Sequence, residues 1–198
     1  MQTDNDTTRP VLVVIGPSAS GKSTVVRELA RRGVLDVHPT WTTRPRRTDE
    51  YEHEVEHRFV SDNVFDELAA HGFFLGAVGL PGLPFRYALP RPRLHADGPL
   101  DTIMARAPFV ERLGEFFPST LVYQIEDTPA RAWLRLVERG TDADEVAARA
   151  AAYGHEAAAG HAMAQRVFVN DCSLDELIDD FESALALDLM SSAIEVRQ

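Results

Sequence analysis

The sequence is poor in cysteine, in lysine and in long apolar runs, and each shortage excludes a class of protein. Its one cysteine, Cys172, cannot form an intramolecular disulfide, so a disulfide-stapled secreted domain is excluded. The first apolar run, Val11 to Ile15, is too short for a signal peptide or a membrane span. We therefore predict a cytoplasmic protein with no membrane partner.

Positive charge is also scarce. The 198 residues hold 20 Lys and Arg against 31 Asp and Glu, which gives a formal net charge of -11. Proteins that coat DNA or RNA carry the opposite sign, so we expect no nucleic-acid partner. Hydrophobic residues make up 44% and charged residues 26%, a composition typical of one compact domain with or without a small inserted subdomain.

The remaining pattern alternates strands and helices. Residues 11–15 are continuously aliphatic, as in a parallel strand buried on both faces, and a helical pattern begins at Lys22. Further strands are expected at Leu100–Met104, Thr120–Ile125 and Val167–Val169, and further helices at Pro129–Glu138 and from Asp144 and Leu174. Together these elements predict an α/β fold, a parallel sheet flanked by helices.

Residues 16–23, GPSASGKS, fit the phosphate-loop pattern G-x-x-x-x-G-K-[ST], between the first strand and the first helix. Glycines let successive backbone N–H groups face an anion, and the helix N-terminus adds partial positive charge. Lys22 is the single lysine among 20 basic residues, placed where a compact ammonium suits a polyphosphate, and the Ser23 hydroxyl suits Mg²⁺. The alternative is a chance match on an ordinary strand-to-helix turn.

A second group is Thr40-Trp41-Thr42-Thr43-Arg44-Pro45-Arg46-Arg47, which places three guanidinium groups within four residues. Arginines at this spacing favour bidentate binding of a phosphate. The alternative is a solvated run of charge, paired with Asp49, Glu50 and Glu52.

These segments, in this order, resemble guanylate kinase and its relatives over about residues 10–187. Other matching segments are Phe59-Val60-Ser61, Arg139-Gly140-Thr141-Asp142 and Val169-Asn170-Asp171. The resemblance implies a P-loop NTPase core with an acceptor-binding subdomain at about 36–95 and a short lid at about 135–150. A flexible leader, 1–10, and a tail, 188–198, would flank this domain.

The resemblance also implies ATP and Mg²⁺ as cofactors and gives residues their roles. The ATP-binding positions would be Gly16, Ser18, Ala19, Ser20, Gly21, Lys22, Ser23 and Thr24 of the loop, with Asn170 near the adenine and Ser23 on the metal. The catalytic positions would be Lys22, Arg135, Arg139 and Arg149. The acceptor-binding positions would be Thr40, Arg44, Arg47, His57 and Tyr87.

The departures from the family concern the acceptor. His57 replaces a tyrosine, Gly76 a glutamate and Ile103 an aspartate, so the carboxylates that read guanine are missing. The related ribose 1,5-bisphosphate phosphokinase is similar at His57, at the missing glutamate and at Arg106-Ala107. We therefore expect transfer of the ATP γ-phosphoryl group to a phosphate of a small phosphorylated acceptor, either a GMP-like nucleotide or ribose 1,5-bisphosphate.

Two other functions remain open. One is a guanylate kinase-like module that binds partners without catalysis. The other is a zinc peptidase, because His53-Glu54-Val55-Glu56-His57 spells H-E-x-x-H, a pair of zinc ligands if the segment is helical. The segment from Thr48 to Arg58 has only Tyr51 and Val55 to bury, which disfavours such a helix.

The kinase hypothesis makes Lys22 indispensable. Lys22→Met removes the one ammonium group of the loop, so we expect phosphoryl transfer to be abolished while the circular dichroism spectrum and melting temperature stay unchanged. Near-normal turnover by this variant would remove the assignment.

Overall fold

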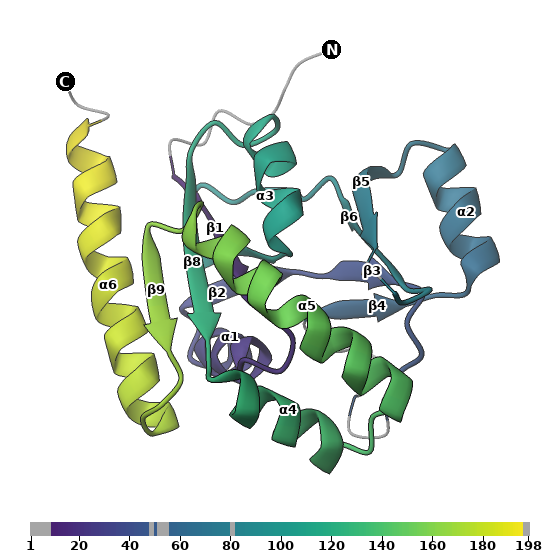
Figure 1. Cartoon of the computed structure of the whole chain (residues 1–198). Helices are drawn as coiled ribbons and strands as arrows, with labels where there is room; N and C mark the ends of the chain where they lie inside the picture. The colour runs from purple at the N-terminus through teal and green to yellow at the C-terminus, as the bar shows by residue number, and fades with distance from the viewer. Residues whose placement is uncertain (1–8, 48–49, 51–55, 80–81, 196–198) are drawn as a thin grey trace.

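The computed structural model describes residues 9–47, 50, 56–79 and 82–195. It contains a five-stranded parallel sheet with helices on both faces and, beside it, a four-stranded sheet with one helix (Figure 1). This architecture confirms the predicted α/β class. The flexible leader was predicted mostly in residues 1–8, which lie outside the described residues.

The core sheet is entirely parallel. Its strands in spatial order are β2 (Leu35–His38), β7 (Leu100–Met104), β1 (Val11–Ile15), β8 (Thr120–Glu126) and β9 (Arg166–Val169). The helices packed around it are α1 (Lys22–Arg31), α3 (Ala107–Gly114), α4 (Pro129–Glu138), α5 (Ala143–His161) and α6 (Leu174–Glu195). The strand and helix positions expected from the sequence are therefore confirmed to within a few residues, because each carries its own apolar period.

Strand β1 is central and fully buried, which explains its unbroken aliphatic run. Leu12 and Val14 point into a cluster that includes residues of α1 and α6, such as Leu29 and Phe181. Val13 and Ile15 point to the opposite face, where α3 packs. A strand with a core on both faces needs apolar residues at every position, not at alternate ones.

The smaller sheet is inserted between β2 and β7. In spatial order its strands are β4 (His57–Phe59), β3 (Thr40–Thr42), β6 (Arg86–Pro90) and β5 (Phe74–Gly79), with helix α2 (Asp62–Ala70) alongside. The Ser61 hydroxyl accepts a hydrogen bond from Val64 N and caps α2. We expected the acceptor subdomain over about 36–95. Because β2 lies in the core sheet, the small sheet itself begins at Thr40.

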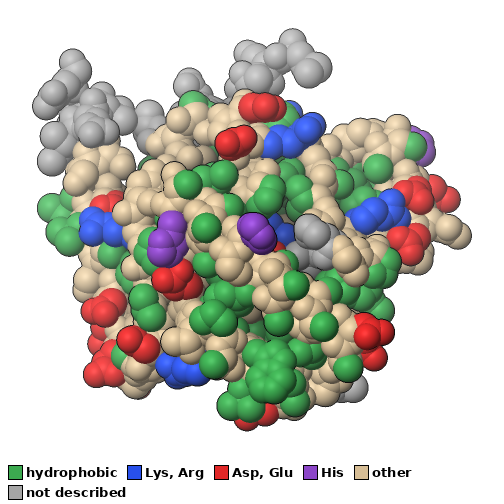
Figure 2. All heavy atoms as spheres, in the orientation of Figure 1, with side chains coloured by type: hydrophobic (Ala, Val, Ile, Leu, Met, Phe, Trp, Pro, Cys, Tyr) green, Lys and Arg blue, Asp and Glu red, His purple; other side chains and the backbone are tan. Residues whose placement is uncertain are grey.

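Helix α6 continues through residue 188, where we expected a tail to begin, and ends at Glu195. Figure 2 shows acidic side chains over α2 and over the lower part of α6. Within the described residues, no helix combines the length and hydropathy needed to cross a bilayer.

Phe181 anchors α6 to the sheet. Its side chain is fully buried and its ring packs edge-on against Tyr123, with centroids 5.1 Å apart. We expect Phe181→Ala to lower the free energy of unfolding by about 3–5 kcal/mol because it leaves a cavity. Leu187→Ala on the same helix is the matched control, since Leu187 is 59% exposed. Urea denaturation measures both, and equal effects would contradict this packing.

Candidate active site

The loop between β1 and α1 has the backbone of a phosphate-binding nest. Gly16, Ala19 and Gly21 have φ values of 140°, 60° and 102°. A Cβ on Gly16 would lie 2.0 Å from the carbonyl oxygen of Ile125, and one on Gly21 would lie 2.2 Å from the side-chain nitrogen of Asn170. Both positions therefore require glycine, for conformation and for space.

Lys22 is buried against this loop. Its Nζ donates hydrogen bonds to the carbonyl oxygens of Gly16 (2.7 Å) and Pro17 (2.6 Å). Burial, assisted by the positive charge of Arg106, lowers the pKa of Lys22 to about 7, although Glu156 acts in the opposite direction. An anion placed beside the ammonium would raise this pKa again.

Other side chains predicted on the ATP side also meet the loop. Arg135 donates to the carbonyl of Ala19 (2.8 Å) and pairs with the buried carboxylate of Asp127. Arg149, only 4% exposed, donates to the Ser18 hydroxyl (2.9 Å). The Asn170 amide donates to the carbonyl of Ser20 (3.0 Å). Three residues that are far apart in the sequence thus contact three successive loop positions, 18–20.

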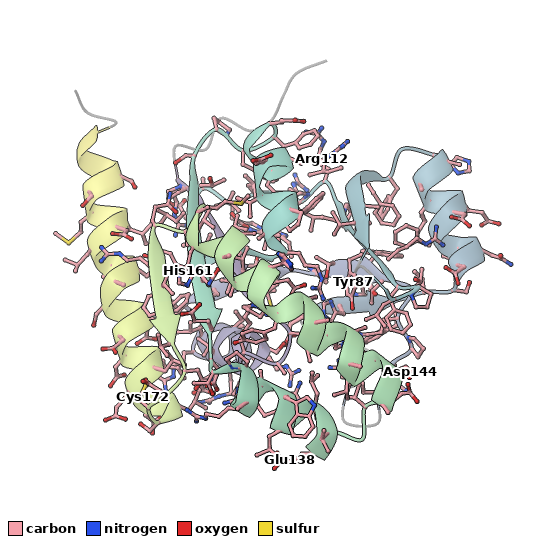
Figure 3. All side chains as sticks on the ribbon, in the orientation of Figure 1. Tyr87, Arg112, Glu138, Asp144, His161 and Cys172 are labelled. Atoms are coloured by element: carbon pink, nitrogen blue, oxygen red, sulfur yellow. The ribbon has the colours of Figure 1, made fainter. Side chains whose placement is uncertain are left out.

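The residues predicted on the acceptor side face the same pocket. Thr40, Arg44, Arg47, His57 and Tyr87 line it together with the loop, Arg139 and Arg149. Tyr87 is labelled in Figure 3, on the small sheet. The predicted site residues therefore lie around one cavity, except that Arg135 and Asn170 contact the loop without lining the cavity.

Arg44 is held in place by Glu50. Its two terminal nitrogens donate to the two Glu50 oxygens at 2.9 and 2.7 Å, and Arg47 N donates to the same carboxylate at 2.8 Å. Burial alone would raise the pKa of Glu50, but these hydrogen bonds outweigh it and lower the pKa to about 2. The ion pair with Glu50, which was expected if these arginines only formed salt bridges, is therefore present. Arg44 and Arg47 nevertheless line the pocket. Asp49 and Glu52 lie outside the described residues.

His57 is neutral in the pocket. Burial and the nearby charge of Arg44 lower its pKa to about 3, and its Nδ1 lies 2.8 Å from the Thr40 hydroxyl. Burial raises the pKa of Tyr87, but the charges of Arg106, Arg149 and Arg44 outweigh it, and the pKa falls below its usual value. Both shifts show that this part of the pocket is strongly electropositive.

The zinc-peptidase hypothesis requires a helix across H-E-x-x-H, but its second histidine, His57, does not lie in a helix. His57 lies in strand β4, where successive side chains point to opposite sides. His53 and Glu54 lie outside the described residues.

Sequence reasoning missed two charged residues at the loop. Arg106, which follows β7, forms an ion pair with Glu156 and lies over the Tyr87 ring, 5.1 Å from its centroid. Glu156 also accepts a hydrogen bond from Ser18 N at 3.2 Å. The sequence pointed to Arg106 only through the family comparison. Glu156 carries no local signal, because it lies in the Ala-rich α5, 138 residues from Ser18.

The space beside Gly76 is already filled. A Cβ there would lie 2.6 Å from Arg112 Nε and 2.9 Å from Phe109 Cε2, both on α3. Arg112 Nε also donates to the carbonyl of Leu75 at 2.9 Å, so its stem is fixed (Figure 3 labels Arg112). A longer side chain at position 76 would therefore require α3 to shift.

Charge in the pocket has one sign. Among the described lining residues there is no carboxylate, and the cationic side chains are Lys22, Arg44, Arg47, Arg106, Arg139 and Arg149. Burial and the charge of Arg44 lower the pKa of Arg47, so its positive charge lacks full compensation. Such a cavity suits a ligand with several phosphate groups.

Comparisons with known proteins agree with this geometry. No protein-family model matches the chain. Guanylate kinases of Thermobifida fusca and Streptomyces kasugaensis are each 36% identical to it over 154 residues, which cover 73% and 71% of this chain and 75% and 70% of theirs. The chain belongs to the guanylate kinase family. It is accordingly an ATP-dependent kinase.

A comparison with solved structures also leads to a guanylate kinase. The crystal structure of guanylate kinase from Anaplasma phagocytophilum superposes with a TM-score of 0.67 at 19% identity, covering 93% of this chain and 88% of that one. This match confirms the P-loop NTPase fold that the sequence predicted. The family therefore rests on the sequence relatives and the architecture on this structure.

The lowered pKa of Lys22 predicts proton uptake on nucleotide binding. Free Lys22 titrates near pH 7, and the nucleotide phosphates raise that pKa, so the complex holds more protons than the free protein. Affinity for MgATP should therefore fall as pH rises above 7, by up to about 10-fold per unit. Calorimetry in two buffers of different ionisation enthalpy at pH 7.5 measures the uptake. Lys22→Gln should abolish it, and an uptake unchanged in that variant would contradict the assignment.

Proposed function

We propose that this kinase phosphorylates a phosphate group of a small acceptor that has no guanine base, of the sugar-phosphate class that includes ribose 1,5-bisphosphate. The observation that carries the proposal is the filled space beside Gly76, where Arg112 and Phe109 stand in place of a base-reading side chain. A guanine in this pocket would leave its N1–H and 2-amino donors without a carboxylate, at a cost of about 1–3 kcal/mol for each unpaired group.

The phosphate loop would hold ATP. Backbone N–H groups of residues 16–21 and the ammonium of Lys22 would bind the β- and γ-phosphates, with Arg135, Arg139 and Arg149 neutralising their charge and Asn170 beside the adenine. Ser23 lines the pocket next to Lys22 and offers a hydroxyl oxygen, the ligand type that Mg²⁺ prefers. Mg²⁺ bound there would neutralise phosphate charge.

The opposite wall would hold the acceptor. Arg44 is preset by Glu50, and Arg47 lies beside it with an incompletely compensated charge, so a phosphate dianion would be favoured between them. The hydroxyls of Thr40 and Tyr87 and the neutral ring of His57 provide hydrogen bonds suited to a sugar. Arg106, which lies between this wall and the loop, would contact the second phosphate of the acceptor.

The chemistry follows from that placement. An oxygen of the acceptor phosphate attacks the γ-phosphorus of ATP, the bond from that phosphorus to the β–γ bridging oxygen breaks, and ADP leaves. The attacking oxygen is already ionised at neutral pH, so no general base is required. The work of this chain is to align the two phosphates and to stabilise the spreading negative charge.

GMP is the second candidate, favoured by the names of the sequence relatives. It would have to be read by Thr40, His57 and Tyr87 alone, since Gly76 offers no side chain. Neutral groups of this kind discriminate guanine less strongly than a carboxylate does.

A screen of acceptors decides between them. ADP release is measured with MgATP and GMP, dGMP, other nucleoside monophosphates or ribose 1,5-bisphosphate. We expect kcat/KM for the sugar bisphosphate to exceed that for GMP by about 10-fold or more, from the unpaired-donor cost above. Lys22→Met is the blank for contaminating kinases. A preference for GMP would overturn the acceptor assignment, and no turnover with any acceptor would overturn the proposed function.

A further inference from the structure

A second polar cluster lies outside the pocket, where the two sheets join. It consists of Asp36 on β2, Asp101 on β7 and His95 in the segment 91–99 that leads into β7. Asp36 and Asp101 are direct neighbours in the parallel pairing of β2 with β7, so the sheet register sets their side chains together. His38, two residues after Asp36, also reaches Asp101.

The ligand atoms of this cluster have the spacing of a metal site. His95 Nδ1 lies 3.0 Å from Asp101 Oδ1 and 3.2 Å from Asp36 Oδ2, and all three atoms lie within 4.8 Å of one another. Ligands bonded to zinc at tetrahedral positions stand roughly 3.3 Å apart. The cluster would need only small movements to enclose such an ion.

One imidazole nitrogen is shared by two carboxylates in this cluster. An imidazole Nδ1 carries at most one hydrogen, yet His95 Nδ1 faces oxygens of two carboxylates. Among the described residues, the partners of the two aspartates in ion pairs are histidines, and neither aspartate pairs with a lysine or arginine. A divalent cation would neutralise both carboxylates at once.

Asp101 is buried and held in place by hydrogen bonds. It is 5% exposed, and its oxygens accept from His38 Nε2 and His95 N, each at 2.7 Å. The Asp36 side chain is 46% exposed and that of His95 50%, which leaves an entry path from solvent.

We propose that Asp36, His95 and Asp101 bind a divalent transition-metal ion of the Zn²⁺ type, with water in the fourth position. Imidazole combined with carboxylates is a ligand set that zinc accepts, and His38 would act as a positioning residue that orients Asp101 by its hydrogen bond. Binding requires His95 Nδ1 to be unprotonated, with the hydrogen on Nε2.

The site would act at the hinge of the small sheet. Residue 39 joins β2 to β3, and residues 91–99 join β6 to β7, so these are connections between the inserted sheet and the core sheet. A metal held by Asp36, Asp101 and His95 would join the connecting segment 91–99, through His95, to strands β2 and β7 of the core sheet. It would limit how far the inserted sheet can rotate, without contacting the kinase pocket.

The test is metal binding by the full chain after dialysis against a chelator, without nucleotide. We expect one equivalent of Zn²⁺ by competition with a chromophoric chelator, and a Co²⁺ adduct with the visible absorption of a four-coordinate site. Asp36→Asn, which keeps the side-chain shape at a half-exposed position, should lower Zn²⁺ affinity at least 10-fold. His38→Gln should lower it by about 10–100-fold through the misplaced Asp101.

Two controls separate this site from other histidines. His71→Ala removes an exposed histidine at the end of α2, and His53→Ala breaks the H-E-x-x-H sequence. Both should retain wild-type affinity. Metal-free melting temperatures show whether the variants fold, and if Asp36→Asn does not, His95→Asn on the connecting segment replaces it.

Three results would overturn the proposal: no stoichiometric binding, equal affinity in the wild type and the folded aspartate or His95 variant, or loss of binding in His53→Ala. None of them bears on the acceptor screen, so the two proposals fail independently.

Discussion

The gathering of six cationic side chains around one cavity is the constraint on which the rest of this molecule depends. In a chain with a net charge of -11, Lys22 and five arginines line one cavity in which the described residues provide no carboxylate. Burial, assisted by the charges of neighbouring arginines, lowers the pKa of Lys22 and of Arg47. A folded protein retains such an arrangement when the binding of a strongly anionic ligand offsets the electrostatic free energy of holding the cations together.

Carboxylates placed behind the cavity make the arrangement tolerable. Glu50 holds Arg44, Asp127 holds Arg135, and Glu145 holds Arg149, and none of the three carboxylates is among the described residues that line the cavity. These pairs fix the orientation of the guanidinium groups before any substrate arrives. Alignment of two phosphates then costs little further ordering of the protein.

The sequence predicted what is encoded locally. The run Val11–Ile15 and the glycine-lysine loop after it carry their own signals, and the structure places both as expected. The spacing of Arg44 and Arg47 indicated a phosphate-binding group before any family resemblance was used, and both side chains line the cavity. Local periodicity and short motifs are therefore sufficient for the core sheet and the phosphate loop, whereas His57, Tyr87, Arg139 and Arg149 were identified only through the family resemblance.

Other features depend on contacts between distant segments, which no single sequence reveals. The Arg112 stem fills the space at Gly76 from 36 positions away, and Glu156 reaches Ser18 across 138 positions. Asp36 and Asp101 meet only because β2 pairs with β7 in a particular register. The boundary of the small sheet was likewise misplaced, since β2 resembles its neighbours in sequence but pairs with the core sheet.

Glu156 gives the substrate-free enzyme an internal surrogate for phosphate. Its carboxylate accepts the N–H of Ser18 and pairs with Arg106, two groups suited to an incoming anion. An anion that enters the loop competes with the Glu156 carboxylate, which belongs to the same chain and therefore has a high effective concentration. A polyphosphate makes many simultaneous contacts and can displace Glu156, whereas an orthophosphate makes fewer contacts and competes less well. A ligand that takes both groups must therefore break the contacts of Glu156 with Ser18 and Arg106.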